Sequence, residues 1–171
     1  PGKLLYRITS DSLSKSGQEQ EGWFNRVLMI EDSQAEGLGR ALPAGRAFIY
    51  MGSLRNNLID QAWFGYTPEA GRIRIDLGRA AEVRGTIRTL GRTETRAGMY
   101  EQEYEIEVIN DRKSIVDVEI TEEPSTTLEW SVIRANTDHT IQGRRILFTL
   151  KVDPGQKKNL RYTLRIREPS V

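Results

Sequence analysis

Hydrophobic and polar residues alternate along most of the chain, so that every second side chain is apolar. Successive side chains of a β-strand point to opposite faces, and this period therefore predicts strands with one buried face. Such strands are predicted over residues 4–8, 27–30, 47–51, 73–77, 83–89, 100–108, 116–120, 128–132, 146–152 and 162–166. No stretch has the period of an amphipathic helix, and we expect an all-β fold.

Short polar segments with Gly, Pro, Asn or Asp separate the predicted strands of the second half. They lie at residues 110–111, 123–125, 136–138 and 153–155. Because such residues favour tight turns, they indicate antiparallel hairpins. About six strands within roughly a hundred residues are typical of an immunoglobulin-like sandwich. We therefore predict an antiparallel β-sandwich that is immunoglobulin-like over residues 79–171.

The first half of the chain, residues 1–78, is also β-rich, and a break near Gly78 and Arg79 separates it from the second. We predict it to be either an incomplete sandwich or one that shares its core with the second half. Residues 11–21 are polar and are predicted to form a long loop. The chain begins at Pro1 without an initiator Met, so we expect a processed or excised piece.

Composition excludes several classes of function. The 171 residues include 25 Lys and Arg against 24 Asp and Glu, with one His and no Cys. A net charge of +1 gives no electrostatic basis for binding nucleic acid or an anionic membrane. Without Cys there is no disulfide and no thiolate zinc site, and one His cannot build a His-rich metal site. Apolar runs are too short to span a bilayer. We expect no metal, no cofactor and no membrane-spanning segment.

Two predicted strands carry opposite charges at alternate positions. The acidic row is Glu101, Glu103, Glu105 and Glu107, and the basic row is Arg161, Arg165 and Arg167, with Thr163 between them. Alternate residues share one face of a strand, so neighbouring rows would form a ladder of ion pairs that helps to set the register. We treat both rows as candidate interaction residues. The alternative is a solvent-facing row without a partner.

Aromatic residues cluster at Trp63, Phe64 and Tyr66. Consecutive residues of a strand point to opposite faces, so at least one of these rings is expected in the core. Trp63 and Tyr66 are the candidates for an exposed site. Aromatic rings on a β-module can stack on sugars, and a carbohydrate site is therefore one hypothesis.

Catalytic constellations are not evident. His139 lies in a polar, turn-like segment, and a triad would need an acid and a nucleophile beside it. There is no GxSxG elbow, and Gly37 and Gly39 lack the third glycine of a dinucleotide-binding loop. We expect His139 to be an exposed loop residue and the protein not to be an enzyme. A hydrolase that uses paired carboxylates is the least supported alternative.

Several segments together carry a family resemblance. They are residues 36–39, 41–46 with the sequence Ala-Leu-Pro-Ala-Gly-Arg, 104–110, 116–120 and 160–166. In this order they resemble the C-terminal β-module of the domain of unknown function 4139 family, whose members include proteins related to mucoidy inhibitor A. The resemblance spans residues 23–167. It implies a β-sandwich at the end of a longer envelope or secreted protein, and it supplies no catalytic residues.

These observations predict a non-catalytic structural or protein-interaction β-module of a cell-envelope or secreted protein, located outside the cytoplasm. The partner is expected to be a protein, and other copies of the chain are one candidate. The first strand, near Leu4 to Ile8, is expected to complete a neighbouring sheet by strand addition. The alternative is a carbohydrate- or envelope-polymer-binding module that uses exposed aromatic residues.

Overall fold

A computed structural model describes residues 2–10, 20–31, 41–51, 57–69, 71–96, 98–124 and 127–168. Pro1, residues 11–19 of the predicted loop, the segment 36–39 and Ser125 lie outside this set. The last two residues of the predicted loop, Gln20 and Glu21, belong to a strand instead. Gly22 follows them, and a Cβ at this position would lie 2.5 Å from Cδ1 of Ile8. The missing side chain therefore permits a close approach between two strands, which brings this segment into the sheet.

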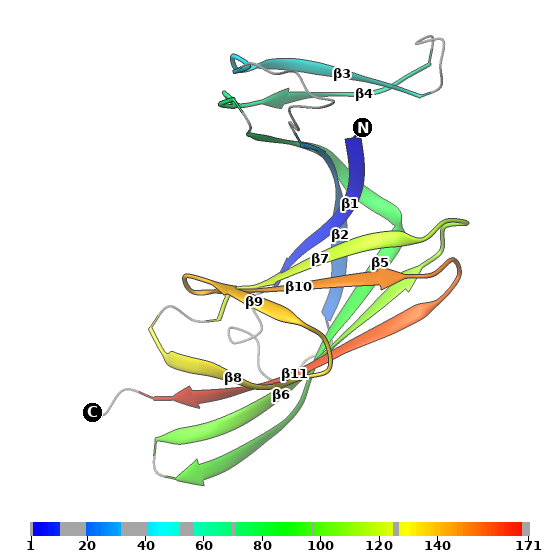
Figure 1. Cartoon of the computed structure of the whole chain (residues 1–171). Coiled ribbons are helices and arrows are strands. Elements are labelled where there is room, and N and C mark those ends of the chain that lie inside the picture. The colour runs from blue at the N-terminus through cyan, green and yellow to red at the C-terminus, as the bar shows by residue number, and fades with distance from the viewer. Residues whose placement is uncertain are drawn as a thin grey trace. The chain divides into compact units, whose positions relative to one another are not determined.

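Eleven strands and no helix make up the regular structure of the described residues (Figure 1). In chain order they are β1 (Gly2–Ser10), β2 (Gln20–Glu31), β3 (Gly45–Met51), β4 (Asn57–Phe64), β5 (Arg72–Arg96), β6 (Met99–Asn110), β7 (Val116–Glu122), β8 (Glu129–Ala135), β9 (His139–Gln142), β10 (Arg145–Val152) and β11 (Lys157–Arg167). The predicted all-β class is thus confirmed. Alternation alone does not predict β4, where Leu58 and Ile59 are adjacent, or β9, which is largely polar.

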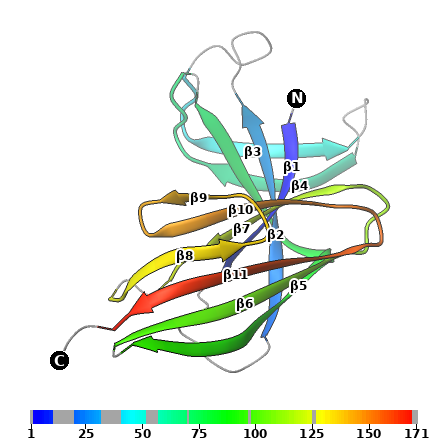
Figure 2. The same ribbon diagram turned by 60° about the horizontal axis from the view of Figure 1, so that its bottom comes forward.

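Nine of the strands form one large mixed sheet that is nearly closed on itself. Its order is β8-β11-β6-β5-β2-β1-β7-β10-β9, and the run from β8 to β5 is visible in Figure 2. β3 and β4 form a separate two-stranded sheet. The immunoglobulin-like sandwich arrangement is not confirmed by this topology. Among the described residues this sheet ends at β8 on one side and at β9 on the other, and these two strands follow each other in the chain.

The chain divides into two compact units, each of which is described by itself. The smaller unit contains residues 1–5 and 25–79, and the larger contains residues 6–24 and 80–171. Three long strands, β1, β2 and β5, contribute residues to both units. β5 is continuous through the predicted break, and Gly78 within it has a φ of +73°, a backbone conformation that favours glycine.

The core of the larger unit lies on the inner face of its sheet. Alternate residues of β11 face this core and are fully buried, namely Leu160, Tyr162, Leu164 and Ile166. Tyr162 stacks on Tyr104 of β6 with 5.2 Å between ring centroids, and it lies 5.1 Å from the ring of Phe148 on β10. Burying each large apolar side chain contributes about 1.5–3 kcal/mol. The inward face predicted for residues 162–166 is confirmed.

Asn110 fixes two turns at one end of the larger unit. Its Nδ2 donates hydrogen bonds to the carbonyl oxygens of Ser114 at 2.9 Å and of Val152 and Asp153 at 3.0 Å. Its Oδ1 accepts a hydrogen bond from the backbone N of Arg112 at 3.0 Å. A buried amide that satisfies so many backbone groups holds the β6–β7 and β10–β11 turns together.

Candidate interaction surfaces

The β3–β4 hairpin exposes aromatic rings on one face. β3 and β4 are antiparallel, with Arg46 opposite Trp63 and Tyr50 opposite Leu58. Residues opposite each other in such a pair project from the same face. Phe48 is 53% exposed, Tyr50 43% and Trp63 70%. We call the exposed apolar side chains of this face the aromatic face: they are Phe48, Tyr50, Leu58, Ile59 and Trp63.

A β-bulge extends this face toward the end of the hairpin. The register shifts between Ile49 and Tyr50, and Ile59 is the extra residue on β4. Both Leu58 and Ile59 are consequently exposed, although strict alternation would direct one of them inward. The aromatic face is therefore partly aliphatic.

Arg46 lies over the Trp63 ring, with Cζ 5.2 Å from the ring centroid. This is a cation–π contact, and it occupies one side of the indole. Tyr66, just beyond β4, is also exposed, whereas Phe64 is half-buried. Trp63 and Tyr66 thus have the exposure that a binding role requires. Sequence reasoning missed Phe48, Tyr50, Leu58 and Ile59, and the available signal was that residues 47–50 are apolar on both faces of one strand.

The two charged rows lie on neighbouring strands. β6 and β11 are antiparallel, and their register places Arg161 opposite Glu105 and Arg165 opposite Glu101. Nε of Arg161 is 2.6 Å from Oε2 of Glu105, and Nη2 of Arg165 is 2.8 Å from Oε1 of Glu101. Glu103 lies opposite Thr163 and is exposed. The more exposed pair, Arg165 with Glu101, contributes roughly 0–1 kcal/mol, so its main effect is to fix the register.

The remaining members of the rows also have partners within the module. Glu107 is 3.6 Å from Nζ of Lys157, and Arg167 is 3.5 Å from Glu129 of β8. Glu105 is buried and also lies 3.6 Å from Arg88 of β5. Most of this charge is therefore engaged internally. A role of the rows in binding a partner stays a prediction.

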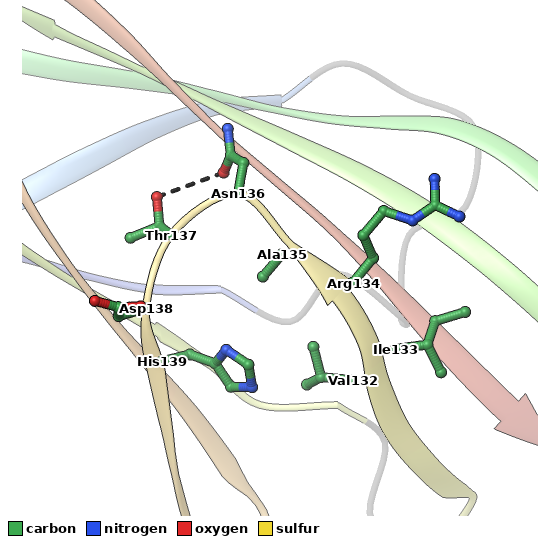
Figure 3. Close-up of a pocket in the computed structure, with 8 residues that line it drawn as sticks. All are labelled: Val132, Ile133, Arg134, Ala135, Asn136, Thr137, Asp138 and His139. Carbon is green, nitrogen blue, oxygen red and sulfur yellow. Dashed lines mark hydrogen bonds between the residues drawn. The ribbon is translucent and has the colours of Figure 1, made fainter.

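An open depression of about 850 Å³ follows the connection from β8 to β9 (Figure 3). Residues 132–139 line it, and Oγ1 of Thr137 donates a 3.4 Å hydrogen bond to Oδ1 of Asn136. Asn136 also accepts a 2.9 Å hydrogen bond from the backbone N of Arg161, which attaches the turn to β11. His139 begins β9 and is therefore not a loop residue as expected, although it is exposed. The His139 ring lies 5.7 Å from the ring of Phe148 on β10. β10 pairs with β9, and this pairing makes His139 part of the sheet.

One tyrosine of the larger unit is electrostatically perturbed. Burial raises the pKa of Tyr100 above its ordinary value, and the guanidinium of Arg92, with Cζ 3.6 Å from the ring centroid, acts in the opposite direction. A hydrogen bond to Glu94 in turn raises the pKa of Arg92. In the described part of the chain, no group of three or more His, Asp or Glu side chains is placed to hold a metal ion.

No protein-family model matches this chain, and no curated protein has a significant match to it. Within the described ranges there is also no helix that could cross a membrane.

Proposed function

We propose that the protein is a non-catalytic protein-interaction module and that the aromatic face binds the partner. The observation that carries this proposal is the exposure of Trp63, Phe48 and Tyr50 side by side on one hairpin, with Arg46 stacked on the indole. Trp, Tyr and Arg are the residues in which binding energy concentrates at protein interfaces. Apolar side chains that are exposed together on one surface are typical of an interaction site.

The aliphatic part of the face favours a protein over a sugar. Leu58 and Ile59 offer neither hydrogen-bond donors nor acceptors, whereas a sugar surrounds its stacking rings with hydroxyl groups that need them. Arg46 also covers one side of Trp63. A protein partner can bury all of these groups together.

Photo-crosslinking tests the proposal. A photoreactive residue in place of Gln61, which lies opposite Phe48 on the same face, should form discrete protein adducts in an extract of the source cells. The double variant Phe48→Ser/Trp63→Ser should lose them. A photoreactive residue in place of Glu103, exposed on the charged rows, is the matched control. Adducts that are equally abundant in the double variant would contradict the proposal.

Carbohydrate or envelope-polymer binding is the second candidate, because Trp63 and Tyr66 are both strongly exposed. It requires sugars to stack on the free side of Trp63. A glycan array should then give hits that Trp63→Ala abolishes. An array without hits would leave the protein partner as the supported function.

The family resemblance supports a proposal about the kind of protein to which this module belongs. We propose that the chain is related to the domain of unknown function 4139 family, that it belongs to a cell-envelope or secreted protein, and that its second half is immunoglobulin-like. The all-β fold and the position of Pro43 and Ala44 directly before β3 are compatible with this relationship. Strand addition through β1 has less support, since β1 lies between β2 and β7 in the sheet.

A further inference from the structure

We infer that two copies of this chain pair through β8, edge to edge and antiparallel, about a twofold axis. The inference rests on the proposed protein-interaction function and names one partner, a second copy. β8 is an edge of the nine-stranded sheet and, within the described ranges, pairs with β11 alone. The backbone N–H and C=O groups of such an edge are a template for another strand.

Apolar side chains on the inner face of β8 remain incompletely covered. Trp130, Val132 and Ala135 pack against the core but are only partly buried. The residues opposite them on β11 are fully buried, namely Ile166, Leu164 and Tyr162. The difference arises because, among the residues that the structure describes, β8 has a neighbour on one side only. A second strand beside β8 would cover these side chains.

β8 lacks three of the features that usually protect an edge, although it has a β-bulge at Ile133. Edge strands of monomeric proteins avoid association through Lys, Pro, inward-pointing charges or β-bulges. Residues 129–135 contain neither Lys nor Pro, and the two charged residues, Glu129 and Arg134, are on the outward face. Both are exposed.

The charges on this outward face are self-complementary. Thr163 and Leu164 of β11 oppose Arg134 and Val132, so Ile133 is the extra residue of a β-bulge. When Ser131 opposes Ser131 of the second copy, the bulge brings Glu129 opposite Arg134 of that copy. The twofold axis repeats this ion pair at the other end of the interface. Trp130 then faces Val132 of the second copy on the inner side, which keeps apolar groups together.

The other edge fits a dimer less well. β9 has four residues, all exposed, and carries no pair of opposite charges. Pairing of β8 with β9 of another copy would be head to tail and would build a ring or an open polymer rather than a twofold dimer. The size of the particle therefore separates the two arrangements.

Light scattering and sedimentation of the full chain over a range of concentrations provide the first test. We expect a reversible dimer. Glu129→Arg places like charges opposite each other and should weaken the dimer by roughly tenfold or more. Arg134→Glu should do the same. The double variant Glu129→Arg/Arg134→Glu should restore part of the affinity, because the swap keeps the pairs between the copies but removes the ion pair of Glu129 with Arg167. A monomer at all concentrations, a polymer, or a dimer that is indifferent to the single variants would overturn the inference.

A single-cysteine variant provides the second test, because the chain has no Cys of its own. Directly opposed residues of antiparallel strands have Cα atoms about 4.5–5.5 Å apart, which a disulfide can span. Ser131→Cys should therefore form a covalent dimer on mild oxidation. Thr140→Cys on the edge strand β9 is the control and should not. Crosslinking of the control in preference to Ser131→Cys would place the contact at β9 and contradict the inference.

The proposed dimer and the proposed binding of a partner by the aromatic face can be refuted independently of each other. Phe48→Ser/Trp63→Ser alters the aromatic face of the smaller unit and should leave the dimer intact. Glu129→Arg alters β8 and should leave the crosslinks from position 61 intact. Loss of both the dimer and the crosslinks in either variant would indicate misfolding, which circular dichroism of the same samples detects. In that case the disulfide test with Ser131→Cys still shows whether the dimer forms through β8.

Discussion

The phenolic hydroxyl of Tyr162 donates a 2.8 Å hydrogen bond to Oε2 of Glu122, and both side chains are fully buried. Tyr162 belongs to β11 and Glu122 to β7, which are not neighbours in the sheet. The bond therefore joins non-adjacent strands through the core. A buried carboxyl group requires such donors, because its transfer from water is costly.

Tyr162→Phe removes this donor and keeps the ring. We expect the free energy of unfolding to fall by about 1–3 kcal/mol, the usual cost when a buried polar group loses a partner. Urea denaturation measures it. Tyr66→Phe, at an exposed phenol, is the control and should change stability by less than about 0.5 kcal/mol. Equal effects of the two variants would show that the hydrogen bond adds nothing.

Gly85→Ala tests the close packing of β5 against β2. A Cβ at Gly85 would lie 2.8 Å from Cε2 of the buried Phe24 and 3.4 Å from the carbonyl oxygen of Glu107. We expect a loss of about 1–3 kcal/mol from overpacking. Gly91→Ala lies in the same strand with nothing within 4 Å of its Cβ and should be nearly neutral. Phe24→Leu should recover part of the loss in Gly85→Ala, and its failure to do so would remove the steric explanation.

Glu105 and Glu103 should differ in their contribution to stability although both belong to the acidic row. Glu105 is buried beside Arg161 and also accepts a 3.4 Å hydrogen bond from Nδ2 of Asn159. Glu105→Ala should therefore cost about 1–3 kcal/mol. Glu103→Ala, at an exposed position opposite Thr163, should stay within about 0.5 kcal/mol. Thermal unfolding of the two variants side by side makes the comparison.

Tyr100 should titrate above the ordinary tyrosine range. Because burial raises its pKa in the folded chain, the native state holds this proton more tightly than the unfolded state. Its contribution to stability is thus complete below the unfolded pKa of about 10 and is lost as the pH rises through the folded pKa. Tyrosinate absorbance of the native protein should lose part of its late-titrating amplitude in Tyr100→Phe.

Arg92→Gln gives the opposite control for the same site. The guanidinium lowers the pKa of Tyr100, so its removal should move the late titration to still higher pH. A shift to lower pH would contradict the charge effect and would show that Arg92 acts mainly by covering the Tyr100 ring.

The sequence by itself determined the class of fold and the faces of most strands. The alternation of apolar and polar residues along a strand shows which side chains face the core. Tyr162, Leu164 and Ile166 can therefore be identified as inward-facing before it is known which strands lie beside them. The acidic and basic rows can be predicted from the sequence for the same reason. The sequence shows that Trp63 and Tyr66 are close together in the chain, but it does not show that both are exposed. Alternation does not predict which ring a neighbouring element covers.

The tertiary structure alone decided which strands pair. Alternation predicts to which face of a strand each side chain points, but it does not predict which strands lie side by side. Paired strands can be far apart in the chain, as β6 and β11 or β1 and β7 are. The aromatic face depends on the register of β3 with β4 and on the bulge at Ile59, and neither follows from composition. The polar strand β9 forms because β10 offers it an edge. The same long-range pairing puts β8 at the end of the sheet within the described part of the chain, and this position is a property of the fold rather than of the seven residues in the strand.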